Sequence, residues 1–385
     1  MRLFDNIQRC HHGTRNYLED GFSFVNRSAR PAARRVRGVL EAWFDKYPDG
    51  EKPPLRSLFR SDFDAAFWQL LLYALFRQLG ASLTPHPVLP TESNRSPDYL
   101  VQWPGGAGCF IEATVARDQS DDEIGKERRM AILYDEIERM DMSEFSIKFS
   151  DVQDTGGLQP SPKKLRQFIE NKIADLDPDE LTSLIKERGL GALPSWRYCD
   201  GEYGVTIVVY PRTDLARKNT ENHSIRALPT KARAGSPAPA LYRSMSKKAT
   251  YYGQLRQPFL VAINSMSPWI TTDIDMVEAL FGRAKAPLVD GQCPHGADGL
   301  WCGPRGPRNR RVSGVIGGTG VVPWSIGRAR LCLYYNPFAE RPCADIPWCL
   351  DTCSVCNDAL HWEEGATVGE LLGLPSDWPG QLFPN

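Results

Sequence analysis

The chain has no long apolar run and almost no net charge. No stretch approaches the ~20 apolar residues that a membrane-spanning helix needs. The start, MRLFDNIQRCHHGTRNYLED, is too polar for a secretory signal, so a cytoplasmic protein with no membrane partner is expected. The formal net charge of −1 gives no overall attraction to nucleic acid. Basic residues still gather at 27–37, 212–233 and 303–312. These clusters are either contacts for phosphates or ordinary solvated surface.

Signatures of several common enzyme classes are also missing. There is no GxSxG motif, and the six histidines lie mostly in expected loops, which gives little support to a serine or cysteine hydrolase. The glycine-rich VIGGTGVV at 315–322 has neither the lysine of a P-loop nor the spacing of a dinucleotide fingerprint. A turn next to a strand is the better interpretation of that segment.

The ten cysteines are too scattered for a small disulfide framework, so reduced thiols are expected. Four residues of the tail have the types and a permissive spacing for a tetrahedral Zn²⁺ site: Cys349, Cys353, Cys356 and His361, with Cys343 as a substitute. Only one CxxC pair is present there. Unbound or packing thiols are therefore the alternative to zinc.

Apolar periodicity predicts a globular chain of mixed helices and strands. The composition, 42% hydrophobic and 24% charged, allows a sizeable core. The strongest helix signal covers 61–80, where Ser61 or Asp62 can cap the start and Gly80 the end. Strands are expected at 81–89, 98–103 and 109–116, and the PGGAG turn predicts that the last two form an antiparallel hairpin. Further helices are expected at 28–46, 121–140, 161–176, 178–189, 241–255 and 273–282, and further strands at 202–211, 258–265, 312–318 and 330–336.

This order of elements predicts an α/β fold, mixed with α+β character, in which helices flank a mixed sheet. We expect an N-terminal helical segment at 1–60 and a core at 61–270 with an insertion at about 141–240. Residues 271–385 are expected to form a C-terminal extension packed on the core.

Two acids in the expected hairpin need a physical reason, because carboxylates in half-buried strands are costly unless paired or bound to a cation. If Trp103 pairs with Cys109, then Leu100 pairs with Glu112, and Asp98 shares a face with Glu112 on the diagonal. Such a pair suits Mg²⁺ or Mn²⁺, hard cations that prefer oxygen ligands. The alternatives are that Asp98 binds nearby amides at a strand start and that Glu112 pairs with a basic residue.

The segment resembles the PD-(D/E)xK nuclease superfamily. Pro97 and Asp98 begin one strand, and Glu112, one spacer and Thr114 form ExT in place of ExK on the next. A broader resemblance, carried by FDAAFWQLLLYALFRQLG, SPDYLV, IEATVA, YYGQLRQPFLVAIN and LLGLPSDWP, is to a family of uncharacterised bacterial proteins with this core. The resemblance implies a restriction-endonuclease-like fold and a magnesium-dependent endonuclease, a hydrolase that binds and cuts DNA in preference to RNA. A homodimer is compatible with it.

The chain departs from the superfamily at two positions. Thr114 stands where nucleases carry a lysine, and Lys247 or Lys248 on the helix before the 258–265 strand could replace it, unless both lie on a solvated helix face. Gln69 stands where related nucleases often have a glutamate, so it is either an auxiliary metal ligand or a partly exposed helix residue. The alternative function is a catalytically inactive nuclease-fold module that binds nucleic acid or a protein partner.

Overall fold

The computed structural model describes residues 1–89, 95–217, 224–227, 236–253, 255–267, 271–283, 298–343, 346–356 and 359–380. Much of the basic cluster expected at 212–233 therefore lies outside the described residues. Within the described ranges, no helix is long and apolar enough to cross a membrane.

The chain begins with a group of helices. They are α1 (Gly21–Arg27), α2 (Pro31–Asp45), the 3₁₀ turn η1 (Asp49–Glu51), α3 (Lys52–Ser61) and α4 (Phe63–Gln78). The α4 helix begins where the Asp62 side chain accepts a hydrogen bond from the Ala65 amide, as a capping residue should. It ends before Gly80, whose φ of 85° is a conformation that favours glycine.

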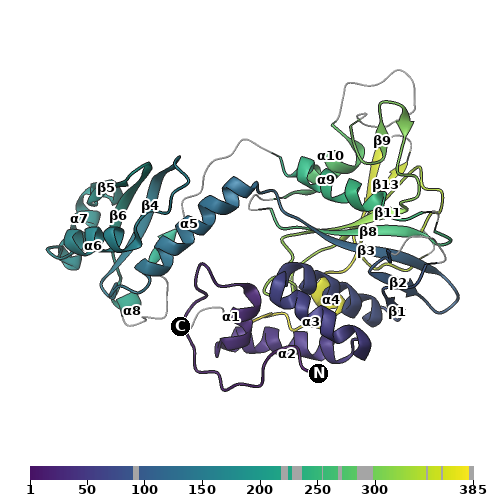
Figure 1. The fold of residues 1–385 in the computed structure, drawn as a ribbon, viewed down its shortest axis with the longest axis horizontal. Coiled ribbons are helices and arrows are strands. Elements are labelled where there is room, and N and C mark those ends of the chain that lie inside the picture. The colour runs from purple at the N-terminus through teal and green to yellow at the C-terminus, as the bar shows by residue number, and fades with distance from the viewer. Residues whose placement is uncertain are drawn as a thin grey trace.

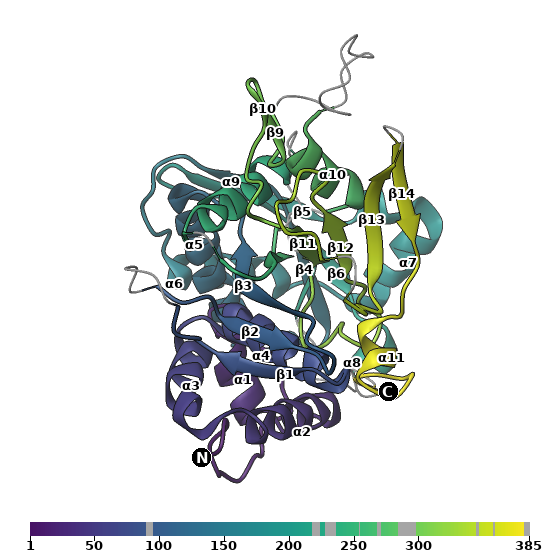
Figure 2. The ribbon, with the colours of Figure 1, turned by 90° about the vertical axis from the view of Figure 1, so that its right-hand side faces the viewer.

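One mixed sheet of eight strands forms the centre of the molecule. Its order is β1-β2-β3-β8-β11-β12-β13-β14. The strands are β1 (Ser82–Pro85), β2 (Tyr99–Gln102), β3 (Gly108–Ala116), β8 (Phe259–Ser265), β11 (Gly314–Thr319), β12 (Cys332–Tyr335), β13 (Asp351–Cys356) and β14 (Ala359–Glu363). The β8 strand runs parallel to both neighbours and every one of its residues is buried, which explains its unbroken apolar sequence. In Figure 2 the sheet crosses the view from β1 and β2 to β13 and β14.

Helices cover both faces of this sheet, so the expected α/β class with a large mixed sheet is confirmed. On one face lies α4, which is buried between the sheet and the other N-terminal helices. Its Trp68 donates a hydrogen bond of 3.0 Å to the Ala262 carbonyl of β8. On the other face lie α9 (Ala238–Ala249) and α10 (Asp273–Phe281). Figure 1 shows α1–α4 below the sheet and α9 and α10 above it.

A second, smaller α/β unit is inserted between β3 and α9. Its sheet has the order β5-β6-β4-β7, and α5 leads into it from the large sheet (Figure 1). Its elements are α5 (Asp121–Ile137), β4 (Phe145–Asp154), α6 (Pro162–Ile173), α7 (Pro178–Arg188), η2 (Leu190–Ala192), β5 (Ser195–Asp200), β6 (Tyr203–Pro211), α8 (Asp214–Arg217) and β7 (Ile225–Ala227). The unit has its own hydrophobic core, formed by α5–α7 against one face of this sheet.

Several elements differ from the sequence-based expectation. Residues 52–61 form α3, which was not expected and has two prolines in its first turn, where proline is tolerated. The strands β4 and β5 were not expected, although Phe145, Ile147 and Phe149 alternate with polar residues in β4. Residues after 336 also form elements that were not expected: β13 and β14 join the large sheet, and α11 (Val368–Leu371) follows them. The short strands β9 (Cys302–Gly303) and β10 (Gly306–Pro307) form a separate two-stranded sheet.

Cysteine chemistry matches the expected reduced state at most described positions. Eight cysteines carry free thiols. Cys302 is disulfide-bonded, which corrects the expectation at this one position.

Candidate functional site

The two acids singled out by the sequence, Asp98 and Glu112, meet where β2 begins beside β3; they are called the acid pair below. The register pairs Tyr99 with Ile111 and Leu100 with Phe110, so the expected pairing of Leu100 with Glu112 was wrong by two residues. The turn is tighter than assumed, because the Trp103 amide bonds the Ala107 carbonyl. A slip of two residues preserves the face on which each side chain lies. Asp98 is therefore placed opposite Glu112 instead of on its diagonal.

Asp98 is held by a side chain and by the backbone of the neighbouring strand. Its Oδ1 accepts a hydrogen bond of 3.1 Å from Gln69 Nε2 on α4, and its Oδ2 accepts one of 2.7 Å from the Ala113 amide. The hydroxyl of Tyr99 in turn donates to the Gln69 carbonyl at 3.1 Å. Gln69 thus meets the acid pair as an amide donor in this arrangement.

Glu112 is contacted by side chains from α9 and the loop after it, on the face of the sheet opposite to α4. Its side chain is almost fully buried, and Lys248 Nζ from the last turn of α9 lies 2.5 Å from its Oε1. The hydroxyl of Tyr252, in the loop after α9, lies 2.5 Å from its Oε2 and 3.0 Å from the Ser96 carbonyl. A buried ion pair with further hydrogen bonds fixes the carboxylate firmly, because any unmet partner would be costly.

The two candidate lysines, Lys247 and Lys248, point in different directions from α9. Lys248 is partly buried and faces Glu112, with its ammonium also 5.1 Å from the centre of the Tyr251 ring. Lys247, one position earlier, is exposed, and no side-chain contact of it is found among the described residues. Thr114 lies two residues after Glu112 on the same face of β3 and pairs with Ile263 of β8. The cation that reaches the acid pair therefore comes from α9.

The acid pair carries more negative charge than the site neutralises. Burial and the neighbouring Glu112 raise the pKa of Asp98 to about 7, against the lowering effects of the Ala113 amide and of Lys248. Burial and Glu112 also raise the pKa of Tyr252 far above its usual range, so its hydroxyl remains protonated and acts as a donor. Within the described ranges, no basic side chain lies within ion-pair distance of Asp98.

This donor set fits a hard divalent cation. Mg²⁺ is usually bound by one or two carboxylates and completes its shell with water and substrate oxygens, so the acid pair supplies the expected type and number of protein ligands. An excess of buried negative charge around Asp98 is what such an ion would neutralise. No group of three or more His, Cys, Asp or Glu side chains that could together hold a metal ion is found in the described part of the chain.

The four expected zinc ligands do not converge. Strand alternation places Cys353 on one face of β13 and Cys356 on the other. His361 of β14 pairs with Ser354 and so shares the face of Cys356, where both side chains are exposed. Cys353 is packed in the core behind them, and Cys349 is exposed before the strand.

Sequence reasoning missed Tyr252 as part of the site. The helix was expected to continue to 255, but α9 ends at Ala249. Tyr252 follows Lys248 by four residues, a spacing that places two side chains on one side of a continuing helix, and this was the available signal. The loop after α9 keeps that proximity without the helix.

Comparison of the chain with protein-family models, with curated proteins and with solved structures finds no match. The family expected from the sequence therefore stays a prediction.

Proposed function

We propose that the chain is a magnesium-dependent nuclease-like enzyme that hydrolyses phosphodiester bonds, most readily in DNA. The observation that carries the proposal is the ammonium of Lys248 at 2.5 Å from Glu112. This contact supplies, from α9, a cation that the ExT motif lacks on β3. Because a buried ion pair can also serve structure alone, this one supports the proposal through its position beside Asp98, on the same strand as Thr114.

The order of elements around the acid pair supports a restriction-endonuclease-like core. The succession α4, β1, β2, β3, then α9 and β8, is helix, three strands, helix and strand, interrupted only by the inserted unit. The hairpin of β2 and β3 and the parallel neighbour β8 carry the acids, while α4 and α9 bring side chains from the two layers. This agreement between order and site supports the proposed core.

Asp98 and Glu112 would hold the Mg²⁺ ion, with Gln69 as an auxiliary oxygen ligand if its amide turned. When bound, the ion would polarise a phosphodiester and make a water molecule more acidic. The chain's own contribution is orientation and charge: Tyr252 and the Ala113 amide hold the two carboxylates, and Lys248 offers a positive charge to the anion that builds up during phosphodiester cleavage.

A cleavage assay with the full chain tests the proposal. Purified protein with Mg²⁺ or Mn²⁺ is incubated with supercoiled plasmid, linear duplex, single-stranded DNA and RNA. We expect cutting of DNA that is lost on chelation and in Asp98→Asn and Glu112→Gln. Cutting that persists in both variants, or none on any substrate with either metal, contradicts the proposal.

A second candidate, an inactive module that binds nucleic acid or a protein partner, is favoured by one observation. All four oxygens of the acid pair already accept a hydrogen bond from the protein, from Gln69, the Ala113 amide, Lys248 and Tyr252. Such a closed network has less need of a cation. Calorimetry separates the two candidates: the inactive module would show no divalent-metal binding that depends on Glu112.

A further inference from the structure

Two cations lie against one tyrosine ring beside the acid pair. The guanidinium carbon of Arg95 is 4.6 Å from the centre of the Tyr251 ring, and the ammonium of Lys248 is 5.1 Å from the same centre. Because both distances end at one point, the two cations are closer together than the Debye length of about 10 Å at 0.1 M salt, so their fields add. The Tyr251 ring attracts both and joins the ammonium that contacts Glu112 to a second positive charge.

Arg95 is also placed relative to Glu112 by its own segment of chain. The carbonyl of the next residue, Ser96, accepts a hydrogen bond of 3.0 Å from the Tyr252 hydroxyl, and this hydroxyl lies 2.5 Å from Glu112 Oε2. Two adjacent contacts, from Arg95 and from Ser96, therefore join this segment to the loop after α9. They set the position of the guanidinium relative to the acid pair.

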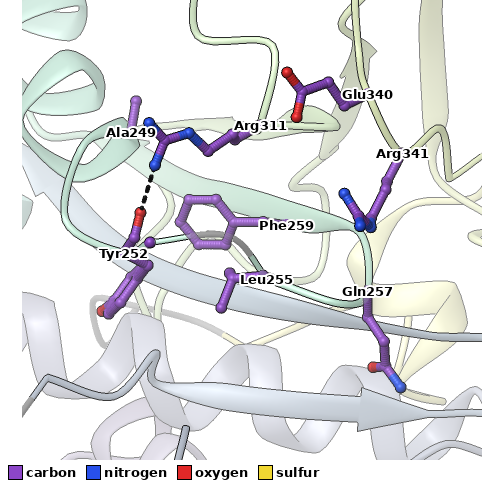
Figure 3. Close-up of a pocket in the computed structure, with 9 residues that line it drawn as sticks. Ala249, Tyr252, Leu255, Gln257, Phe259, Arg311, Glu340 and Arg341 are labelled. Atoms are coloured by element: carbon purple, nitrogen blue, oxygen red, sulfur yellow. Dashed lines mark hydrogen bonds between the residues drawn. The ribbon is translucent and has the colours of Figure 1, made fainter. Parts of the chain in front are cut away.

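The loop after α9 is itself held from behind. The Phe259 ring of β8 packs edge-on against the Tyr252 ring with centroids 5.4 Å apart, and Arg311 Nη1 donates to the Tyr252 carbonyl at 3.2 Å (Figure 3). The Tyr251 and Tyr252 rings lie edge to face with centroids 6.3 Å apart. Because Tyr252 is held by its ring, its carbonyl and its hydroxyl, the neighbouring Tyr251 has a fixed place from which to hold the two cations.

Exposure to solvent rises from the buried carboxylate towards Arg95. The side chain of Glu112 is 6% exposed and that of Lys248 24%, while Arg95 is an exposed residue. The charge of Arg95 also reaches the site: burial and Glu112 raise the pKa of the Tyr252 hydroxyl, and Arg95 acts on it in the opposite direction. An anion that approaches Lys248 from solvent therefore meets the combined field of both cations.

The chemistry of the two cations indicates the ligand. A planar guanidinium binds phosphate through two parallel hydrogen bonds, whereas the compact ammonium of a lysine acts as a point charge. Lys248 is bonded to Glu112 and faces the reacting group, so Arg95 is the cation placed for a neighbouring phosphate. A strand of nucleic acid supplies phosphates next to the one that reacts, and a single free anion does not.

We propose that Arg95 binds the phosphate next to the one that is cleaved, and that Tyr251 is a positioning residue that holds Arg95 and Lys248 in place. This inference rests on the proposed function of the acid pair. It adds to that function a substrate-binding residue outside the ExT motif, and it defines the ligand as a strand with at least two phosphates.

Fluorescence anisotropy of labelled DNA, as duplex and as single strand, measures the proposed contact in the presence of chelator, so that cleavage plays no part. We expect Arg95→Gln to weaken binding about tenfold and to lower the slope of log affinity against log salt by about one, because one phosphate contact is lost. Arg95→Lys should restore the slope and part of the affinity, and it keeps the test possible if the glutamine variant fails to fold.

The matched control is Arg77→Gln at the end of α4. It removes the same charge from another exposed arginine that also lies against a ring, with its guanidinium carbon 5.9 Å from the centre of the Tyr73 ring. Its affinity for DNA should stay within about twofold of the wild-type value.

Steady-state cleavage of a short labelled duplex with Mg²⁺ separates the two roles. Arg95→Gln should raise KM more than it lowers kcat, because a phosphate outside the reacting bond is bound equally in the substrate complex and in the transition state. Tyr251→Leu should raise KM and also lower kcat, because Lys248 loses its support. Tyr251→Phe keeps the ring face and should restore both values.

Unchanged affinity and salt slope in Arg95→Gln overturn the inference, and so does an equal loss in Arg95→Gln and Arg77→Gln. Displacement of labelled DNA by inorganic phosphate as effectively as by unlabelled DNA, at equal phosphate concentration, would identify a site for a free anion and overturn it too. If Arg95→Gln loses binding but wild-type protein cuts no substrate with either metal, the proposed function fails and the binding contact stands.

Discussion

The acid pair is the place where side chains from both helical layers contact the sheet, and Glu112 has the charged partner. Glu112 lies on β3, receives Lys248 from α9 and Tyr252 from the following loop, and raises the pKa of Asp98, which Gln69 of α4 holds from the other side. A single buried carboxylate with this many partners is sensitive to the loss of any of them. The residue-scale predictions therefore concern its nearest charged neighbours.

Lys248→Met is expected to reduce metal-dependent DNA cutting by about 10²–10³-fold, because a preorganised positive charge at the reacting group is removed. The matched control is Lys247→Met, which removes the same charge one position earlier, where the side chain is exposed. Initial rates on plasmid DNA with Mg²⁺ measure the difference. Equal losses in the two variants would contradict the assignment of Lys248.

The acid pair should make stability depend on pH. The pKa of Asp98 is raised to about 7 in the folded chain, above its unfolded value near 3.9, so the folded state holds the proton more tightly between these values. The free energy of unfolding contributed by Asp98 must then fall as pH rises from about 4 to about 7, and level off above.

Urea unfolding at pH 5, 6, 7 and 8 measures this dependence, with Asp98→Asn as the comparison because asparagine keeps the shape without the titration. The free energy of unfolding of the wild-type protein, minus that of Asp98→Asn, should fall from pH 5 to about pH 7 and then level off. At pH 6, metal binding should also release protons, seen as a buffer-dependent heat in calorimetry. A pH-independent difference would show that Asp98 titrates normally.

At the scale of elements, α9 decides where Lys248 points. Leu241, Met245 and Ala249 recur at four-residue spacing and are buried against the sheet, so the turn that carries Lys248 has a fixed rotation about the helix axis. Its neighbour β8 pairs in parallel with β3, which brings α9 over Glu112. The position of the lysine thus depends on packing some distance from the site.

Met245→Ala should destabilise the chain by about 2–5 kcal/mol, because the side chain is fully buried and leaves a cavity under α9. Arg243→Ala, on the exposed side of the same helix, should change stability by less than about 0.5 kcal/mol. Chemical denaturation of both variants tests the expected contrast. Similar values would mean that α9 is not held by this face.

At the scale of the whole molecule, the inserted unit and the large sheet have separate hydrophobic cores. They are linked by α5 and by the N-terminal segment, where the amides of Tyr17 and Leu18 donate to the Asp135 carboxylate at 2.7 and 3.2 Å. The Tyr17 and Tyr134 rings also pack with centroids 5.0 Å apart. Among the residues that the structure describes, few contacts for a unit of this size join it to the large sheet, so we expect the two to unfold separately.

Calorimetry should therefore show two unfolding transitions. Phe149→Ala, which removes a buried ring of the inserted unit, should lower the midpoint of one transition, at a cost of about 3–5 kcal/mol, and leave the other in place. Binding of Mg²⁺ should raise only the transition that Phe149→Ala leaves unchanged, because the acid pair belongs to the large sheet. A single transition shifted as a whole would contradict this division.

The sequence by itself determined the elements whose patterns are local. The apolar run and caps of α4, the hairpin of β2 and β3 and the buried β8 could be read from neighbouring residues. The shared face of Asp98 and Glu112 was predicted despite the wrong register, because strand alternation has a period of two and the error was two residues.

Only the tertiary structure decided which lysine faces Glu112 and that the Tyr252 hydroxyl also contacts this carboxylate. It also decided that β13 and β14 complete the sheet and do not form a zinc site with His361. Lys248 and Glu112 are 136 residues apart, and the inserted unit between them carries no local sign of their contact. The physical reason is that the rotation of α9 and the pairing of edge strands follow from burial against distant residues, which a local pattern does not encode.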